Sequence, residues 1–264
     1  MSAIPKNAAD APLVLREQVG PVVTLTLNRP AQFNALSEAL LEVLTEQLSS
    51  IARDSSVRVV VLAAAGKAFC AGHDLREMRA DPSLDYYQEL FARCATMMMT
   101  IQRMPQPVIA RVQGIATAAG CQLVGMCDLA IAAEDAKFAV SGVNLGLFCA
   151  TPSVALSRNL SRKAAFEMLV TGEFIDAPQA AQRGLINRAV PAAQLDAEID
   201  RVAQLIADKP PLAIAAGKGL FYRQLEMGIE AAYQLAGQTQ ACNMMAEPTL
   251  EGVQAFIDKR KPNW

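Results

Sequence analysis

The chain has 264 residues, of which 52% are hydrophobic and 19% are charged, and its formal net charge is −2. This length suits one domain with an appended part, and the weak negative charge argues against a protein that binds nucleic acid through a basic face. No apolar run approaches the roughly 18 residues that a membrane-spanning helix needs, so we expect no membrane span.

Cysteine usage bears on metal sites and on compartment. The six cysteines contain no C-x-x-C pair, and there is one histidine, so a zinc site would need an unusual ligand set. Cysteines scattered through apolar stretches are typical of reduced core residues in a cytoplasmic protein. Residues 1–12 contain no arginine and no basic region followed by an apolar one. We therefore expect a disordered tail at 1–12, no secretory signal, and a cytoplasmic location.

The first part of the chain predicts strands, a helix and then another strand. Strands are expected at 13–19 and 22–27, with a turn between them, and Ser37 is expected to cap a helix whose leucines recur at helical spacing. The run 57–64 is β-branched and almost wholly apolar, which indicates a buried strand. After it we expect a loop of small residues, a mobile polar loop at 76–85, and a helix at 86–104. The methionines Met97, Met98 and Met99 in that helix fit core filling better than an acyl pocket.

The second part begins with another buried strand and ends in helices. Pro105 and Pro107 precede an expected strand at 108–112, which leads into small residues and an apolar helical segment. Further strands are expected at 127–133 and 137–140, a helix capped by Ser161 and ended by Gly172, a short helix at 178–183, and an extended segment at 185–190. From 195 onward only helical periodicity is found, at 196–207, 212–225, 229–245 and 250–259.

Two of these strands run into turns built of small residues, one around Ala71 and one around Ala119. Small residues let a ligand approach the backbone closely, and the start of a helix presents unpaired N–H groups. Two such turns could each offer one N–H to a single carbonyl oxygen, which is how an oxyanion hole is built. The alternative interpretation is that small residues only allow a helix to pack tightly on a sheet.

Three runs in order, LNRPAQFNALS, KAFCAGHDL and VQGIATAAGCQLVGMCDLAIA, resemble the crotonase (enoyl-CoA hydratase/isomerase) superfamily over residues 13–264. The runs ATAAGCQLVGMCD, GVNLGLFCATPSVAL and DKRKPNW are most similar to the enoyl-CoA hydratase domain-containing proteins. The resemblance implies an α/β fold, with a spiral of β-β-α repeats at 13–194 and a helical oligomerisation region at 195–264. It also implies an acyl-CoA substrate, no separate cofactor because coenzyme A is part of that substrate, and a homotrimer or homohexamer.

The resemblance also implies site residues. The two backbone donors of the family's oxyanion hole correspond to the N–H groups of Ala71 and Ala119. Its substrate-binding positions correspond to Ala68, Ala71, His73, Asp74, Leu75, Ala119, Gly120 and Lys259. The carboxylate of Asp74 is expected to fix its loop by accepting nearby N–H groups. Lys259 could meet CoA phosphates of its own or a neighbouring subunit, or it could be a solvated end of a helix.

The catalytic side chains depart from the family pattern. The two glutamates of the hydratases correspond to Gln122 and Gly142, and neither residue can accept a proton at neutral pH. His73 is the one side chain that titrates near pH 7 and is a candidate replacement base, or its ring simply faces solvent or CoA. Near the matching acyl pocket lie Ser141, Asn144, Cys149 and Thr151, with Cys149 expected to be a core thiol. Glu134 and Asp135 are expected in a surface turn.

Two functions remain open at this point. The first is an enzyme that stabilises the enolate of an acyl-CoA thioester, for hydration, isomerisation or another reaction. The second is an acyl-CoA-binding or regulatory protein without strong catalysis. The absence of both glutamates favours the second function or an atypical form of the first.

Overall fold

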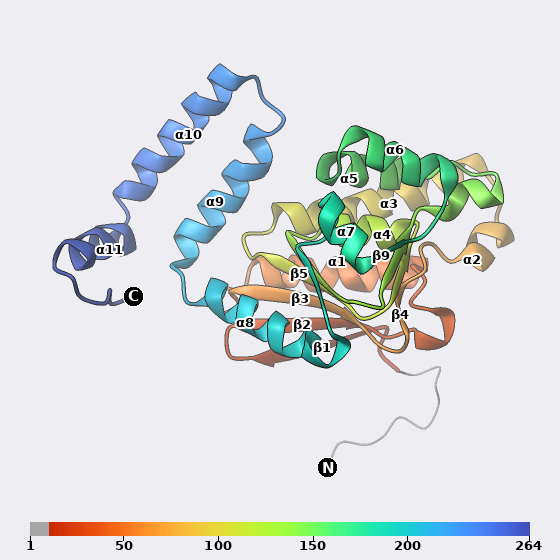
Figure 1. Ribbon diagram of the computed structural model, residues 1–264, viewed down its shortest axis with the longest axis horizontal. Coiled ribbons are helices and arrows are strands. Elements are labelled where there is room, and N and C mark those ends of the chain that lie inside the picture. Colours follow the sequence, from red (N-terminus) through yellow and green to blue (C-terminus); the bar gives the residue numbers. More distant parts are fainter. Residues whose placement is uncertain (1–10) are drawn as a thin grey trace, which may run out of the picture.

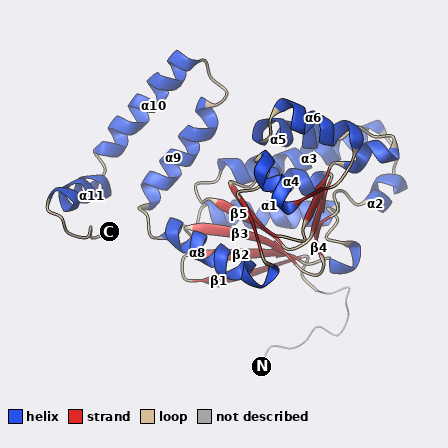
Figure 2. Cartoon of the chain, in the orientation of Figure 1, coloured by secondary structure: helices blue, strands red, loops and turns tan. Residues whose placement is uncertain are grey.

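The computed structural model describes residues 11–264 and shows two packed sheets covered by helices, with a helical arm at the C-terminus (Figure 1). Most of the tail expected at 1–12 lies outside the described residues. None of the helices in the described part is long and apolar enough to cross a membrane. Figure 2 shows the strands gathered under the helices of one half of the molecule, while the arm carries helices only.

The larger sheet has six strands in the order β1-β2-β3-β5-β7-β10. Strand β1 pairs antiparallel with β2, and all other pairs are parallel. The expected run at 57–64 forms β3, and all six of its residues are buried, as a strand covered on both faces requires. The strands are β1 (Val14–Val19), β2 (Val22–Leu27), β3 (Val59–Ala64), β5 (Val108–Val112), β7 (Leu129–Ala133) and β10 (Arg188–Val190).

The smaller sheet has four short strands in the order β4-β6-β8-β9. From β3 to β8 the chain gives one strand to the large sheet and the next to the small one, three times in succession, which confirms the expected repeat. Because β4, β6 and β8 are parallel, the segments that follow them emerge at the same edge. The strands are β4 (Ala68–Cys70), β6 (Ile115–Thr117), β8 (Lys137–Ala139) and β9 (Ile175–Asp176).

Helices begin where capping side chains favour them. Ser37 Oγ accepts the N–H of Leu40, and Ser161 Oγ accepts that of Ala164, so both predicted caps are confirmed. Met97 and Met98 are core residues, as expected. The helices up to residue 183 are α1 (Glu38–Ala52), α2 (Leu75–Ala80), α3 (Leu84–Arg103), α4 (Ala119–Met126), α5 (Ala150–Asn159), α6 (Arg162–Thr171) and α7 (Ala177–Arg183).

Two predictions about the middle of the chain were wrong. The segment 76–85 is not a loop throughout, because Asp74 caps the short helix α2 and Ser83 caps α3. Helix α5 was not predicted at all, since its sequence ATPSVALSRN combines a proline with several residues of weak helix propensity. Proline stands in the first turn of α5, where the missing N–H costs nothing.

The last four helices divide into one that packs on the sheet and three that form the arm. Helix α8 buries Leu195 and Ile199 against strands of the large sheet, so by its contacts it belongs with the core. The division expected at residue 195 stays a prediction about folding units. The arm stands away from the sheets (Figure 1). These helices are α8 (Leu195–Ala207), α9 (Pro211–Gln224), α10 (Ile229–Met244) and α11 (Glu247–Ile257).

A buried polar cluster attaches the arm to the core. Lys218 of α9 is only 9% exposed. Its Nζ donates to the backbone oxygens of Ile101 and Gln106, both at 2.8 Å, and to Asp128 Oδ2 at 2.6 Å. Tyr222 donates its hydroxyl to Asp128 Oδ1 at 2.8 Å. Every polar atom of the Lys218–Asp128 pair thus has a partner, which is the condition for burying such a pair.

Candidate active site

The second small-residue turn places an unpaired N–H group at the start of α4. Ala118 donates its N–H to Ala139 O of β8 at 2.9 Å and has φ 49 and ψ −120. This backbone conformation is rare for a residue with a side chain. Ala119 follows as the first residue of α4, and its N–H has no partner among residues 11–264. The turn therefore presents a backbone donor beside the edge of the small sheet.

The first small-residue turn has its free donor at His73. Ala71 donates its N–H to Phe33 O at 3.0 Å, so the expectation that Ala71 offers a free oxyanion donor does not fit the structure. Leu36 pairs with the loop on one side: its N–H bonds Gly72 O at 2.8 Å and its oxygen accepts the N–H of Asp74 at 3.1 Å. Backbone direction alternates, so the N–H of His73 points away from Leu36. It has no partner in the described residues.

The two turns lie against each other. A methyl group on Gly72 would lie 2.9 Å from Ala118 Cβ and 3.3 Å from the Ala119 nitrogen. A methyl group on Gly120 would lie 2.1 Å from the oxygen of Cys70, so helix α4 touches the backbone of β4. Both interpretations of the small residues, tight packing and an oxyanion hole, therefore apply. The small residues let the two turns pack tightly, and this packing brings the segments that carry the free N–H groups of His73 and Ala119 next to each other.

Side chains around the first turn hold its backbone in place. Asp74 accepts the N–H of Arg76 at 3.1 Å and pairs with the guanidinium of Arg29 at 3.0 Å, which confirms its expected role in fixing the loop. Ala68 is buried in β4, and its oxygen accepts the amide of Asn34 at 2.8 Å. Leu75, the first residue of α2, is 55% exposed.

The ring of His73 is enclosed and uncharged at neutral pH. Burial lowers the pKa of His73 to about 4. Both ring nitrogens are inaccessible and lack a hydrogen-bond partner in the described residues. The ring stands edge-on to Phe91 of α3, with 5.5 Å between centroids. The ring therefore does not face solvent, and its low pKa makes it a weak base in the free protein.

Neither position of the family's glutamates can transfer a proton here. Gln122 lies one turn after Ala119, is 5% exposed, and has an Oε1 without a partner in residues 11–264. Gly142 lies in a short 3-10 segment, Ser141–Leu145. A methyl group on Gly142 would lie 2.6 Å from Leu147 O and 2.7 Å from Cys149 Sγ. The surroundings of Gly142 therefore leave no room for a side chain.

The other residues expected near an acyl pocket lie in and beside this segment. Cys149 is 6% exposed, and its Sγ accepts the N–H of Gly142 at 3.3 Å. Asn144 reaches across to Gly172 O at 3.5 Å, and Ser141 and Thr151 are half-buried. The acids Glu134 and Asp135 are exposed in the turn between β7 and β8, as expected.

Lys259 lies far from these turns within the same chain. It follows α11 in the arm, at the opposite end of the molecule from α2 (Figure 1), and it is exposed. Of the two subunits in which Lys259 could meet CoA phosphates, only a neighbouring one stays compatible with this arrangement.

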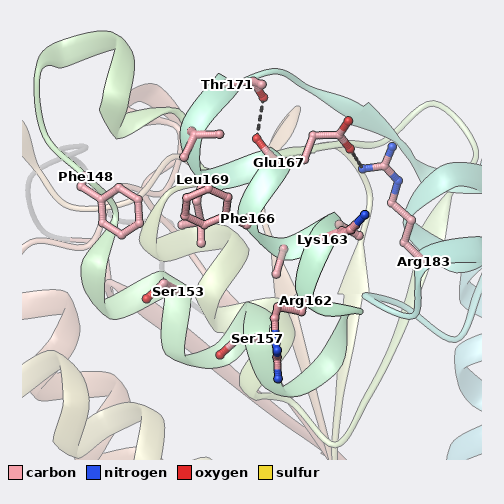
Figure 3. Close-up of a pocket in the computed structure, with 13 residues that line it drawn as sticks. Phe148, Ser153, Ser157, Arg162, Lys163, Phe166, Glu167, Leu169, Thr171 and Arg183 are labelled. Carbon is pink, nitrogen blue, oxygen red and sulfur yellow. Dashed lines mark hydrogen bonds and ion pairs between the residues drawn. The ribbon is translucent and has the colours of Figure 1, made fainter.

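A cavity of about 1090 Å³ opens beside the Cys149 segment. It lies between α5 and α6, where Phe148 and Phe166 come together with Leu169 while Arg162 and Lys163 lie at its border (Figure 3). None of the residues of the two donor turns lines it. Among residues 11–264 no group of three or more His, Cys, Asp or Glu side chains is placed to hold a metal ion.

Sequence reasoning missed two features of the site. The donor at His73 could not be identified from the sequence, because only the pairing with Leu36 shows which N–H groups of the turn are used. Cys149 was expected to be a core thiol. Its contact with Gly142 depends on the path of residues 141–149, which no local sequence pattern predicts.

Comparison with known proteins gives the family. A model described as enoyl-CoA hydratase/isomerase matches residues 17–264. The mouse protein named "Enoyl-CoA hydratase domain-containing protein 3, mitochondrial" is 43% identical over 264 residues, covering 100% of this chain and 88% of the relative. A 2,3-dehydroadipyl-CoA hydratase of Escherichia coli is 36% identical, covering 96% of this chain and 97% of the relative.

Solved structures agree with this assignment. An enoyl-CoA hydratase of Mycobacterium smegmatis is 64% identical with a TM-score of 0.95, covering 96% of this chain and 99% of that one. Human enoyl-CoA hydratase domain-containing protein 3 is 42% identical with a TM-score of 0.93, covering 96% and 100%.

The expectation of a cytoplasmic location is contradicted by the mouse, rat and human relatives, whose names say mitochondrial. All six cysteines are free, but free thiols argue only against oxidising compartments and do not choose among the reducing ones. The family is clear on both sequence and fold: the chain belongs to the enoyl-CoA hydratase/isomerase family.

Proposed function

We propose that the protein binds an acyl-CoA thioester with its carbonyl oxygen between the N–H groups of His73 and Ala119, and that it stabilises the enolate formed from that thioester. Coenzyme A is part of this substrate, and no separate cofactor is involved. The observation that carries the proposal is the meeting of two turns that each keep one N–H without a partner in residues 11–264, one of them at the start of a helix. Donors in this arrangement stabilise negative charge as it develops.

The chemistry of the site limits which reactions are fast. Each preorganised donor contributes about 3–4 kcal/mol to a developing oxyanion. A general base adds roughly 10²–10⁴-fold, and neither Gln122 nor Gly142 supplies one. Enolate stabilisation without efficient water activation is therefore the activity that this site supports best. Ordinary hydration of an enoyl-CoA should be slow, and binding without turnover is the alternative.

Replacing Ala119 by proline tests the donor directly. Proline removes the N–H and is tolerated at the first position of a helix, but it also restricts the preceding Ala118, which has φ 49, so the folding of the variant is checked first. A lost neutral hydrogen bond costs about 0.5–1.5 kcal/mol, so the affinity for butyryl-CoA in calorimetric titration should fall about two- to twelvefold. The matched control is Leu84→Pro, at the first position of α3, where the side chain is 70% exposed.

The control should bind butyryl-CoA as the wild type does. Unchanged affinity in a folded Ala119→Pro variant, confirmed by a thermal melt, would remove Ala119 from the site. If Ala119→Pro unfolds, Gly72→Ala is tested next, because its methyl would lie 3.3 Å from the Ala119 nitrogen and would obstruct the same donor; Gly72 has φ 94, so a thermal melt must first show that this variant folds.

We propose in addition that the protein assembles as a homotrimer or homohexamer through the arm. The support is the apolar surface that α10 and α11 leave uncovered: Ile229 is 73% exposed, Tyr233 74%, Met245 76% and Phe256 85%. Several large apolar side chains left exposed on neighbouring helices are a feature of surfaces that contact other proteins. Light scattering should give three or six times the 28.2 kDa chain mass. A monomer mass at micromolar concentration would contradict this assembly.

A further inference from the structure

Helices α4 and α5 lie side by side and begin at the same end. A methyl group on Gly125, in the second turn of α4, would lie 3.5 Å from the Cβ of Ala155, in the second turn of α5. At the other end, Ala118 donates its N–H to Ala139 O at 2.9 Å, and three residues after Ala139 the N–H of Gly142 bonds Cys149 Sγ at 3.3 Å. Because the contacts advance together along both helices, the helices are parallel. The free N–H of Ala119 and the start of α5 thus adjoin.

Cys149 stands at the start of α5 and turns its sulfur to the backbone of Gly142. It is the residue immediately before the ten-residue helix, and Gly142 donates its N–H to Sγ at 3.3 Å. Burial raises the pKa of the Cys149 thiol, so the group holds its proton at neutral pH. A negative charge left on this sulfur would be stabilised by the N–H of Gly142 and by the helix N-terminus.

A second side chain in the same place lacks a partner. Gln122 is 5% exposed, and its Oε1 has no hydrogen-bond donor among residues 11–264. Side chains on a helix tilt toward its N-terminus, so Gln122 leans toward the end of α4 that Ala119 and Cys149 share. A buried amide oxygen without a donor costs about 1–3 kcal/mol. That unsatisfied acceptor points to a ligand or a ligand-bound water in this space.

We propose that Cys149 is the catalytic acid that delivers a proton to the α-carbon of the bound acyl-CoA enolate. This inference rests on the proposed function, because the enolate must first be held at Ala119. In the step, the Sγ–H bond breaks and its electron pair stays on sulfur. The enolate C=C pair forms the new Cα–H bond, and the carbonyl is restored. Sulfur then recovers a proton from water, so no further reactant is consumed.

Cys149 suits this step better than the other groups near the donors. The ring of His73 packs edge-on against Phe91 of α3 and is uncharged at neutral pH, so it is a poor proton donor. Gln122 has no proton that it can give up at neutral pH. A thioester enolate is far more basic than a thiolate, so even a thiol that is hard to ionise can protonate it.

Hydrogen exchange at the α-carbon tests the proposal without requiring net turnover. The reverse step lets the small thiolate fraction remove an α-proton, so wild-type protein in D₂O should place deuterium on the α-carbon of butyryl-CoA, followed by mass spectrometry. Cys149→Ser keeps the size of the side chain and should lower the exchange rate at least about 100-fold, the scale of a lost acid–base group. Cys149→Ala should do the same.

The control is Cys121→Ala, which removes a neighbouring buried thiol and should leave the exchange rate unchanged. Calorimetric titration of each variant with butyryl-CoA runs beside the exchange assay. Binding without exchange by the wild type would overturn the role of Cys149 and leave the proposed function standing. Exchange that persists in Cys149→Ser and Cys149→Ala would also overturn it. Absence of both binding and exchange would overturn the proposed function and this inference together.

Discussion

Adding one methyl group at Gly142 should destabilise the fold, because the space for a side chain is already filled. The methyl of Gly142→Ala would lie 2.6 Å from Leu147 O and 2.7 Å from Cys149 Sγ. Gly142 is not among the residues with positive φ, so backbone strain adds nothing. Overpacking of this kind costs about 1–3 kcal/mol, and displacing Sγ also weakens its hydrogen bond by roughly 0.5–1 kcal/mol.

The expected loss is therefore about 1.5–4 kcal/mol, which corresponds to a fall in melting temperature of roughly 3–16 °C for a chain of this size. Differential scanning calorimetry measures it. Gly219→Ala is the matched control, since Gly219 lies in α9 with nothing within 4 Å of the added methyl, and it should be neutral or slightly stabilising. Cys149→Ala combined with Gly142→Ala should recover part of the loss, because one of the two clashes disappears.

If Gly142→Ala melts like Gly219→Ala, the 141–149 segment is more adaptable than its contacts indicate. The result also bears on any attempt to restore hydration by placing glutamate at this position. Glutamate at 142 would have to displace Leu147 or Cys149 before it could act, so the variant would report on a rearranged pocket.

Three further expectations follow from the same structure. Lys218→Met should lower the free energy of unfolding, measured in urea, by about 3–5 kcal/mol, because Asp128 stays buried without its cation. Adding Asp128→Asn to this variant should recover part of the loss. If the effects of the two substitutions simply add, Lys218 and Asp128 are not energetically coupled. The pKa of His73 is about 4 in the folded protein against 6.5 for the free side chain. The unfolded chain therefore takes up this proton first as pH falls, so the free energy of unfolding decreases between pH 6.5 and 4. His73→Phe should show a smaller decrease between pH 7 and 5 in urea titrations. Equal decreases in the two proteins would show that the His73 ring is not the group responsible. Gly120→Ala should weaken butyryl-CoA binding at least about tenfold in calorimetry, since its methyl would lie 2.1 Å from Cys70 O and would push α4 off β4; wild-type affinity would show that the spacing of the two turns is not critical.

Much of the fold could be predicted because its signals are local. The buried strand β3 is almost continuously apolar, and Ser37 and Ser161 carry side chains that cap helices wherever the following residues allow it. Helix α5 could not be predicted, because its residues favour a helix only once its first turn packs beside α4. The short strands β4 and β6 have three residues each, and pairing within the small sheet makes them strands.

The site could be located but not completed from the sequence. Small residues indicate where a ligand can approach the backbone, and from them Ala119 was correctly predicted to lie at the start of a helix. They could not tell which N–H of the first turn is free, because Ala71 is used by Phe33 and that contact joins residues 38 positions apart. Nor could they show that Cys149 stands against Gly142, since the contact arises from the path of a 3-10 segment.

The conformation of Ala118 has a consequence for engineering. A residue with a side chain at φ 49 and ψ −120 is held there against its own preference, at a cost of the order of 1–3 kcal/mol. Glycine accepts this region readily, so Ala118→Gly should make the chain harder to melt while letting the start of α4 sample more orientations. A screen that selects for heat resistance alone would therefore favour a substitution that leaves the Ala119 N–H less well oriented toward the substrate oxygen. Stability and affinity for acyl-CoA should be selected together in this protein.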